Sequence, residues 1–110
     1  MTPVEFRRHL HRHPQLSFRE TESARFIAEA LREAGIPCRP IAGTGVLAKI
    51  EGRGDLRRAV VLRADIDALP IREQSGAAWS SENDGVMHAC GHDIHAAVLY
   101  GTCLLYTSPS

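Results

Sequence analysis

A continuous apolar run, AVVL from Ala59 to Leu62, constrains the fold more than any other feature of this chain. Apolar, β-branched residues without polar alternation are typical of a central strand that is covered on both faces. A second strand is expected over Val46–Ile50, where apolar and polar residues alternate between glycine-containing turns. A strand covered on both faces needs helices around it, so the rest of the chain must supply them.

The first helical signal lies at the start of the chain. Thr2 can cap a helix, Pro3 suits its first position, and Glu5 has the spacing of a capping-box carboxylate. Proline is excluded from a helix interior, so this helix should end near His13, before Pro14. The sequence therefore predicts a short helix at the N-terminus.

Two further helices are expected on either side of the predicted strands. Ser17 and Glu20 have capping-box spacing, apolar residues then recur at helical intervals, and Gly35 should end the helix in a left-handed conformation. A last helix should begin near Gly91 and carry His95, after a surface loop over residues 76–86. The order helix, helix, strand, strand, helix predicts an α/β fold.

Composition limits the classes of function that this chain can serve. Its 110 residues suffice for one small domain, and their formal net charge of 0 gives no electrostatic footprint for nucleic acid or an anionic membrane. The basic run of Arg7, Arg8 and Arg12, interleaved with His9, His11 and His13, is expected on the solvated side of the first helix rather than as a phosphate-binding site. No apolar stretch approaches the roughly 20 residues of a membrane span. Three cysteines at irregular spacing fit a reducing compartment, so a cytoplasmic protein is expected.

Two aspartates, Asp65 and Asp67, follow the AVVL run directly in the segment RADIDALP. Open α/β sheets place their ligand sites at the carboxyl ends of strands, where these residues should lie. The aspartates could cap backbone N–H groups of a loop. Alternatively, one carboxylate could hold a metal-bound imidazole or thiolate in place, or meet the metal itself. This segment alone leaves both interpretations open.

The segment MHACGHDIH concentrates histidine and cysteine within a few residues. Cys90 and His92 form a C-x-H pair whose thiolate and imidazole suit zinc, cobalt or manganese. His88 and His95 have spacings from His92 that could share a helix face, but the intervening glycine turn argues against convergence of all four side chains. Two ligands do not close a metal site, so the site should be completed from elsewhere.

Each of these side chains could also serve the fold without binding a metal. Local hydrogen bonding of His88 and His95 is more common than direct coordination by both. Cys90 could be an inert buried thiol, or a redox or nucleophilic thiol, although no C-x-x-C partner is present. Metal ligation by Cys90 and His92 is the interpretation that we favour.

The segments LRADIDALPI and MHACGHDIHAA together resemble the dinuclear-metal amidohydrolases of the aminoacylase and carboxypeptidase superfamily. The resemblance is to the branch of hippurate hydrolases, indole-acetyl-amino-acid hydrolases and N-acetyldiaminopimelate deacetylases. FRRHLHRHPQLSFRETESARFIAEALREAGI resembles the opening of that branch, and GTGVLAKIEG its first strand segment, so the resemblance extends over residues 4–101. Gln15 departs from it, because the family usually has glutamate in its HPEL motif. We expect little catalytic consequence, but a changed hydrogen bond at the helix junction.

The resemblance implies roles for individual residues. Cys90 and His92 would be metal ligands, with the cysteine thiolate bridging two divalent ions (Mn, Zn or Co). Asp67 matches the catalytic aspartate that orients a metal ligand. In the family, a glutamate outside these residues removes a proton from the attacking water, and a Glu-Glu pair and two more histidine ligands follow the HACGHD segment. The resemblance implies a supporting role, close to the metal ligands, for four further residues: Asp65, His88, Asp93 and His95.

The resemblance also implies an architecture and an activity. Residues 1–101 would be the incomplete N-terminal part of a zinc-exopeptidase-like catalytic domain, and residues 102–110 a non-native or truncated tail, because CLLYTSPS resembles a translated sequencing adapter. The full-length parent protein, of which this chain would be the N-terminal fragment, would hydrolyse the amide bond of N-acyl amino acids or small peptide-like substrates and could form a homodimer. The fragment itself would be inactive. The alternative is a small non-enzymatic metal-binding or thiol-sensing domain that uses His88, Cys90, His92 and His95.

Overall fold

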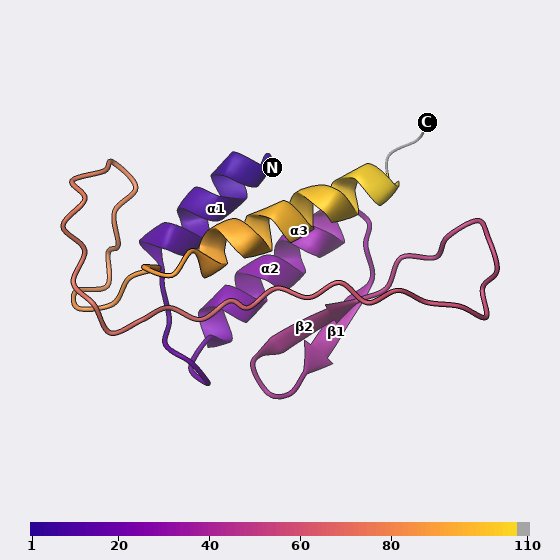
Figure 1. Cartoon of the computed structure of the whole chain (residues 1–110), viewed down its shortest axis with the longest axis horizontal. Coiled ribbons are helices and arrows are strands. Elements are labelled where there is room, and N and C mark those ends of the chain that lie inside the picture. Colours follow the sequence, from indigo (N-terminus) through magenta and orange to yellow (C-terminus); the bar gives the residue numbers. More distant parts are fainter. Residues whose placement is uncertain (108–110) are drawn as a thin grey trace.

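Three helices and one two-stranded antiparallel sheet make up the regular structure of residues 1–107, which are the residues that the computed structural model describes (Figure 1). The elements follow the expected order and confirm the α/β class. They are α1 (Pro3–Arg12), α2 (Thr21–Glu33), β1 (Cys38–Ile41), β2 (Gly45–Ala48) and α3 (His92–Thr107). α3 continues across the boundary expected after Gly101, and the end of the expected tail, residues 108–110, lies outside the described residues.

The start and end of α1 confirm the sequence prediction. The Thr2 hydroxyl accepts a hydrogen bond from the Glu5 N–H, and the Thr2 N–H donates to the Glu5 carboxylate, both at 3.1 Å. Pro3 occupies the first turn, where its missing N–H costs no helical hydrogen bond. The helix ends at Arg12, and His13 is its C-cap.

The predicted start of α2 is wrong. Phe18 has a φ of +64°, so the chain turns there, and the helix begins only at Thr21. Ser17 therefore cannot cap it, and Glu20 at the N-cap makes no side-chain capping bond within the described chain. Instead, the Gln15 side-chain oxygen accepts the Ser23 N–H at 2.8 Å, from outside the helix. This is the hydrogen bond at the helix junction where the family glutamate would stand.

The two strands form a hairpin that the sequence indicated only in part. β2 overlaps the predicted strand, and it pairs with β1 in a register from Cys38 opposite Ala48 to Ile41 opposite Gly45. β1 escaped prediction because Pro40 interrupts its short pattern, which a two-stranded edge tolerates. A Cβ at position 45 would stand 2.8 Å from the Ile41 carbonyl oxygen, so only glycine fits there.

The predicted central strand over Ala59–Leu62 is wrong. This segment forms no strand in the described structure, and Val60 and Val61 are 87% and 83% exposed. A strand requires a neighbour for its backbone hydrogen bonds, and the hairpin of residues 38–48 does not pair with this segment. Figure 1 shows it as an extended stretch that leaves the loop beyond the hairpin and runs along the molecule.

The core lies between the three helices. The ring of Phe6 stacks on Tyr100 of α3, with centroids 4.4 Å apart, and tilts against Phe26 of α2 at 5.2 Å. The Tyr100 hydroxyl donates to the Met1 carbonyl oxygen at 3.1 Å, so the buried ring also fixes the N-terminus. The other buried apolar residues of this cluster are Leu10, Ala30, Leu31, Ile36, Ala96 and Ala97.

Isolated backbone bridges place the RADIDALP segment between two distant parts of the chain. The Ala68 N–H donates to the Gln15 carbonyl oxygen at 2.8 Å. Leu69 and Met87 exchange two backbone hydrogen bonds of 2.9 and 3.0 Å. Asp67 is therefore carried on a segment that is bonded on one side to the turn before α2 and on the other to the cysteine-histidine segment.

The contact of Gln15 with α2 predicts a stabilising substitution. Gln15→Glu places a negative charge at the positive end of the α2 dipole, so we expect the free energy of unfolding to rise by about 0.3–1 kcal/mol at neutral pH. Urea unfolding at pH 7 measures this change, and Gln15→Leu, which removes the acceptor, should lower stability instead. A Gln15→Glu protein less stable than the wild type would contradict the capping role.

Candidate metal centre

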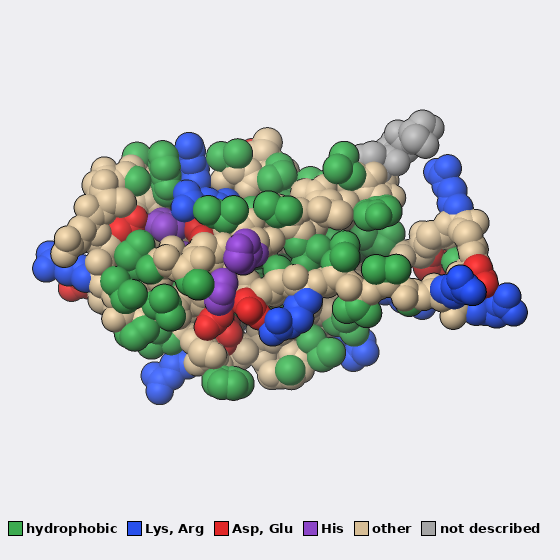
Figure 2. Space-filling model, in the orientation of Figure 1, with side chains coloured by type: hydrophobic (Ala, Val, Ile, Leu, Met, Phe, Trp, Pro, Cys, Tyr) green, Lys and Arg blue, Asp and Glu red, His purple; other side chains and the backbone are tan. Residues whose placement is uncertain are grey.

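The structure brings Asp67 and His92 together from 25 residues apart in the sequence. His92 Nδ1 lies 2.8 Å from Asp67 Oδ1 and 3.1 Å from the Asp67 carbonyl oxygen. Both oxygens accept hydrogen bonds, so Nδ1 carries a proton, which in the neutral ring leaves the lone pair on Nε2. The side chains of Asp67 and His92 are 28% and 20% exposed, so the pair is accessible from solvent. Figure 2 shows histidine side chains beside acidic ones near the middle of one face.

A turn at Gly91 positions Cys90 and His92. Gly91 has a φ of +90°, a left-handed conformation that a side chain disfavours. Its carbonyl oxygen accepts the N–H groups of Ile94 and His95 at 3.1 and 3.0 Å, which begins α3. Cys90 is therefore an exposed free thiol directly before the turn, and His92 is the first residue of the helix.

The chemistry of these side chains fits a metal ion. A carboxylate that holds one imidazole nitrogen while the other stays free is the usual support of a metal-bound histidine. A nearby thiol adds a soft ligand. Within residues 1–107, however, no group of three or more His, Cys, Asp or Glu side chains is arranged to hold a metal ion. The described chain thus offers an incomplete donor set.

The alternative of a closed local site is not supported. His88, Cys90, His92 and His95 would have to converge on one ion, and the described structure does not bring them together in that way. His95 is exposed, and its ring centroid lies 5.9 Å from that of His92. His88 is buried, and it precedes the Gly91 turn in the sequence, whereas His92 and His95 follow it. A four-ligand metal-binding domain therefore lacks the geometry that it needs.

Two of the residues expected in a supporting role lie in different environments. Asp65 forms an ion pair with Arg63, with Oδ1 and Nη2 2.6 Å apart, and its side chain is 42% exposed. His88 is only 4% exposed, and neither of its ring nitrogens has a hydrogen-bond partner in the described structure. Burial lowers the pKa of His88, which favours the neutral ring. Their supporting role stays a prediction.

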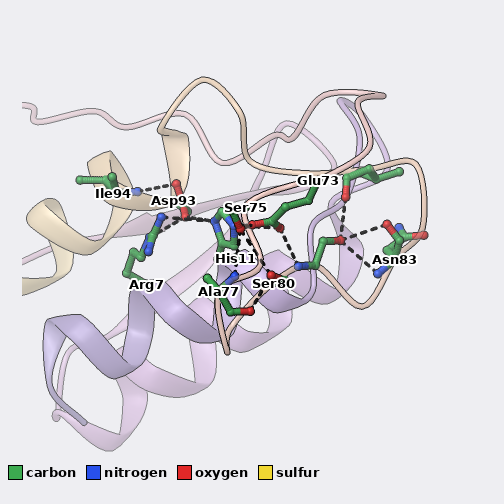
Figure 3. A network of polar contacts seen from close by, with 11 residues as sticks. Arg7, His11, Glu73, Ser75, Ala77, Ser80, Asn83, Asp93 and Ile94 are labelled. Carbon is green, nitrogen blue, oxygen red and sulfur yellow. Dashed lines mark hydrogen bonds and ion pairs between the residues drawn. The ribbon is translucent and has the colours of Figure 1, made fainter.

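Asp93 belongs to a buried network that sequence reasoning missed (Figure 3). Its side chain is fully buried, and Oδ2 accepts hydrogen bonds from Arg7 Nε at 2.8 Å and from His11 Nδ1 at 2.7 Å. The expectation of a solvated basic run is wrong for Arg7, and His11 within that run is only 4% exposed. The helical spacing could have indicated this burial. Positions 7 and 11 come directly after the apolar positions 6 and 10, so they lie beside the buried face of the helix.

The same network extends to the loop before the cysteine-histidine segment. His11 Nε2 lies 2.9 Å from a carboxylate oxygen of Glu73, whose other oxygen accepts the Ser81 N–H at 2.7 Å. Burial raises the pKa of Glu73, but hydrogen bonds from Ser75, Ser81 and His11 outweigh it and lower the pKa to about 2. The loop expected over residues 76–86 is therefore attached to α1 at its base.

Comparison with known proteins places these residues in a family context. Residues 61–107 match the model of peptidase family M20/M25/M40. The chain is 50% identical over 103 residues to the N-acetyl-L-cysteine deacetylase of Bacillus subtilis, which covers 93% of this chain and 24% of that relative. It is 45% identical over 105 residues to an N-acyl-L-amino acid amidohydrolase of Geobacillus stearothermophilus, covering 94% and 28%. The chain thus spans about a quarter of the length of these curated relatives.

A solved structure supports the same assignment. A Bacillus subtilis protein, described as a dinuclear metal binding peptidase of the M20 family, superimposes with a TM-score of 0.86 at 46% identity. The match covers 96% of this chain and 30% of that one. The helices and the sheet are therefore consistent with part of a larger catalytic domain, as the sequence predicted.

The depressed pKa of Glu73 predicts a loss of stability in acid. The pKa is about 2 in the folded chain against an ordinary value of 4.5, so ionised Glu73 stabilises the fold above about pH 4.5. That contribution is lost as the pH falls toward 2. We expect Glu73→Gln to cost on the order of 1–3 kcal/mol at pH 7, and less as the pH falls. Urea unfolding across this pH range measures the difference.

The exposed Glu82 provides the matched control for this test. Glu82→Gln should change stability by less than about 0.5 kcal/mol. A difference between wild type and Glu73→Gln that stays constant from pH 7 to pH 2 would show that the Glu73 charge does not contribute as described.

Proposed function

The chain belongs to peptidase family M20/M25/M40, and we propose on that premise that it supplies part of the metal centre of an amidohydrolase. The observation that carries the proposal is the 2.8 Å contact between Asp67 Oδ1 and His92 Nδ1. His92 lies two residues after Cys90 in the sequence. The chain spans only about a quarter of its curated relatives. The activity is therefore assigned to the complete reading frame that contains this sequence.

Each of the three side chains has a separate task in this proposal. Cys90 Sγ and His92 Nε2 would hold the divalent ions (Mn, Zn or Co). Asp67 accepts the Nδ1 proton of His92, which fixes the plane of the ring and keeps the basic lone pair on Nε2. The two ions would supply Lewis acidity and a hydrolytic water for cleavage of an amide.

N-acyl amino acids and small peptide-like amides are the proposed substrates. The names of the Bacillus and Geobacillus relatives, an N-acetyl-L-cysteine deacetylase and an N-acyl-L-amino acid amidohydrolase, support this choice. Two ligands cannot hold two ions, so the general base and the remaining ligands are proposed to lie outside this sequence. A homodimeric parent and a supporting role for Asp65, His88, Asp93 and His95 are part of the same proposal.

The proposed compartment is the cytoplasm. Cys38, Cys90 and Cys103 are free thiols, and a reducing compartment would keep them so. Among residues 1–107, no helix combines the length and the hydrophobicity that crossing a membrane requires.

The orienting role of Asp67 predicts a loss of metal affinity in the complete protein. Asp67→Asn keeps the size of the side chain but weakens the hydrogen bond that His92 Nδ1 donates to it, because a neutral amide oxygen is a weaker acceptor than a carboxylate. We expect metal affinity to fall by about 10- to 100-fold, measured by titration of the apoprotein with Mn²⁺ or Zn²⁺. Asp55→Asn, at an exposed aspartate paired with Arg57, is the matched control and should leave affinity unchanged. Hydrolysis that survives both exhaustive chelation and Cys90→Ala would contradict the proposal.

The 110-residue chain alone should not hydrolyse N-acetyl amino acids. Its described residues provide no three-ligand group, so an ion bound there would be held weakly. Release of acetate by the purified chain in the presence of Mn²⁺, Zn²⁺ or Co²⁺ is the measurement. A turnover that Cys90→Ala abolishes would show that the chain is sufficient, against this expectation.

A further inference from the structure

Two separate contacts hold the residues around His92. The imidazole ring is held at Nδ1 by Asp67, which lies on the segment bonded to the turn before α2. The backbone is held through the next residue, Asp93, whose Oδ2 is bonded to Arg7 and His11 of α1 (Figure 3). The first contact belongs to the proposed metal centre. The second lies outside it.

We infer that Arg7 and His11 are positioning residues of the candidate metal centre, acting through Asp93. The inference rests on the proposed function, because it takes His92 as a ligand. The direction of a ring nitrogen depends on both the ring contact and the backbone that carries the ring. Asp67 fixes the first of these, and the contact of Asp93 with α1 fixes the second.

The geometry around Asp93 suits this task. Asp93 is fully buried in the first turn of α3, where the positive end of the helix dipole favours a carboxylate. Its Oδ1 accepts the Ile94 N–H at 2.9 Å, while Oδ2 receives Arg7 Nε and His11 Nδ1. A buried carboxylate that loses such partners is strongly destabilised, so α3 cannot move away from α1 at this point without penalty.

His11 also links this contact to the loop at the base of the site. Its two ring nitrogens face two different carboxylates, Asp93 at 2.7 Å and Glu73 at 2.9 Å. Glu73 in turn accepts the Ser81 N–H at 2.7 Å. α1 therefore holds both the start of α3 and the loop that leads into MHACGHDIH, so one helix fixes the cysteine-histidine segment from both sides.

The remaining basic residues of α1 offer matched controls. His13 lies two residues from His11, is half exposed, and contacts the exposed Glu82 at 3.4 Å. Arg12 is exposed, and within residues 1–107 its side chain takes no part in the bonds to Asp93. Substitutions at these positions change the same residue types on the same helix without reaching the network around Asp93.

Nitrogen NMR of the His92 ring tests the inference without requiring metal or activity. In the wild-type chain, labelled with ¹⁵N at histidine and assigned with His92→Gln, we expect the tautomer that carries the proton on Nδ1. In Arg7→Gln and His11→Gln, a second tautomer or exchange broadening should appear at His92. Arg12→Gln and His13→Gln should leave the His92 signals unchanged.

Titration of the complete protein with Co²⁺ provides a second readout, through the absorption of a cysteine-bound cobalt ion. We expect the dissociation constant to rise about tenfold in His11→Gln and not in His13→Gln. A folded His11→Gln chain with unchanged His92 signals and unchanged cobalt affinity would overturn the inference. If His11→Gln does not fold by circular dichroism, Arg7→Lys, which keeps the charge but loses the Nε–H donor, provides the same comparison.

The metal-ligand proposal and the positioning role fail separately in this design. If the complete protein shows no cobalt absorption that Cys90→Ser abolishes, the metal-ligand proposal fails. The His92 tautomer then still decides whether Arg7 and His11 fix the ring. If cobalt binds through Cys90 but the His92 signals do not respond to Arg7→Gln or His11→Gln, only the positioning role is overturned.

Discussion

The buried carboxylate of Asp93 is the interaction on which the arrangement of this chain depends most. It joins the N-terminal helix to the start of α3 through Arg7 and His11, and the carboxylate itself is fully buried. A charge in this position is tolerated only with its partners in place. The packing of Phe6 on Tyr100 joins the same two helices at another level. The polar contact sets their register, and the apolar one supplies the burial.

The contact between Asp67 and His92 follows from this arrangement. α3 begins at His92 because Gly91 turns the chain, and the ring of His92 then meets Asp67 on a segment bonded to Gln15 and Met87. Hydrogen bonds between backbone groups, not regular strands, bring these segments together. A chain that covers a quarter of its relatives can thus still place the proposed ligand His92 and the carboxylate of Asp67 at hydrogen-bonding distance.

Some features encoded by neighbouring residues could be predicted from the sequence, although the capping box at Ser17 and Glu20 was not found. Features that depend on distant partners could not be predicted from the residues alone. The capping box at Thr2 and the helix after Gly91 are local, and both are present. The AVVL segment has the composition of a central strand, but composition does not provide neighbouring strands, and none pairs with it in residues 1–107. His11 looked like part of a solvated basic run because its two carboxylate partners lie 62 and 82 residues away. For the contact of Asp67 with His92, the residues alone left a supporting carboxylate as one of two alternatives, and the family resemblance singled out Asp67.

The most direct test of the central claim is anomalous X-ray diffraction from crystals of the complete protein grown with Mn²⁺ or Zn²⁺. For zinc, the account predicts an anomalous peak about 2.3 Å from Cys90 Sγ and about 2.0–2.1 Å from His92 Nε2, with Asp67 still bonded to Nδ1. A metal held by His92 Nδ1 with Asp67 displaced, or a metal bound without Cys90 and His92, would contradict it.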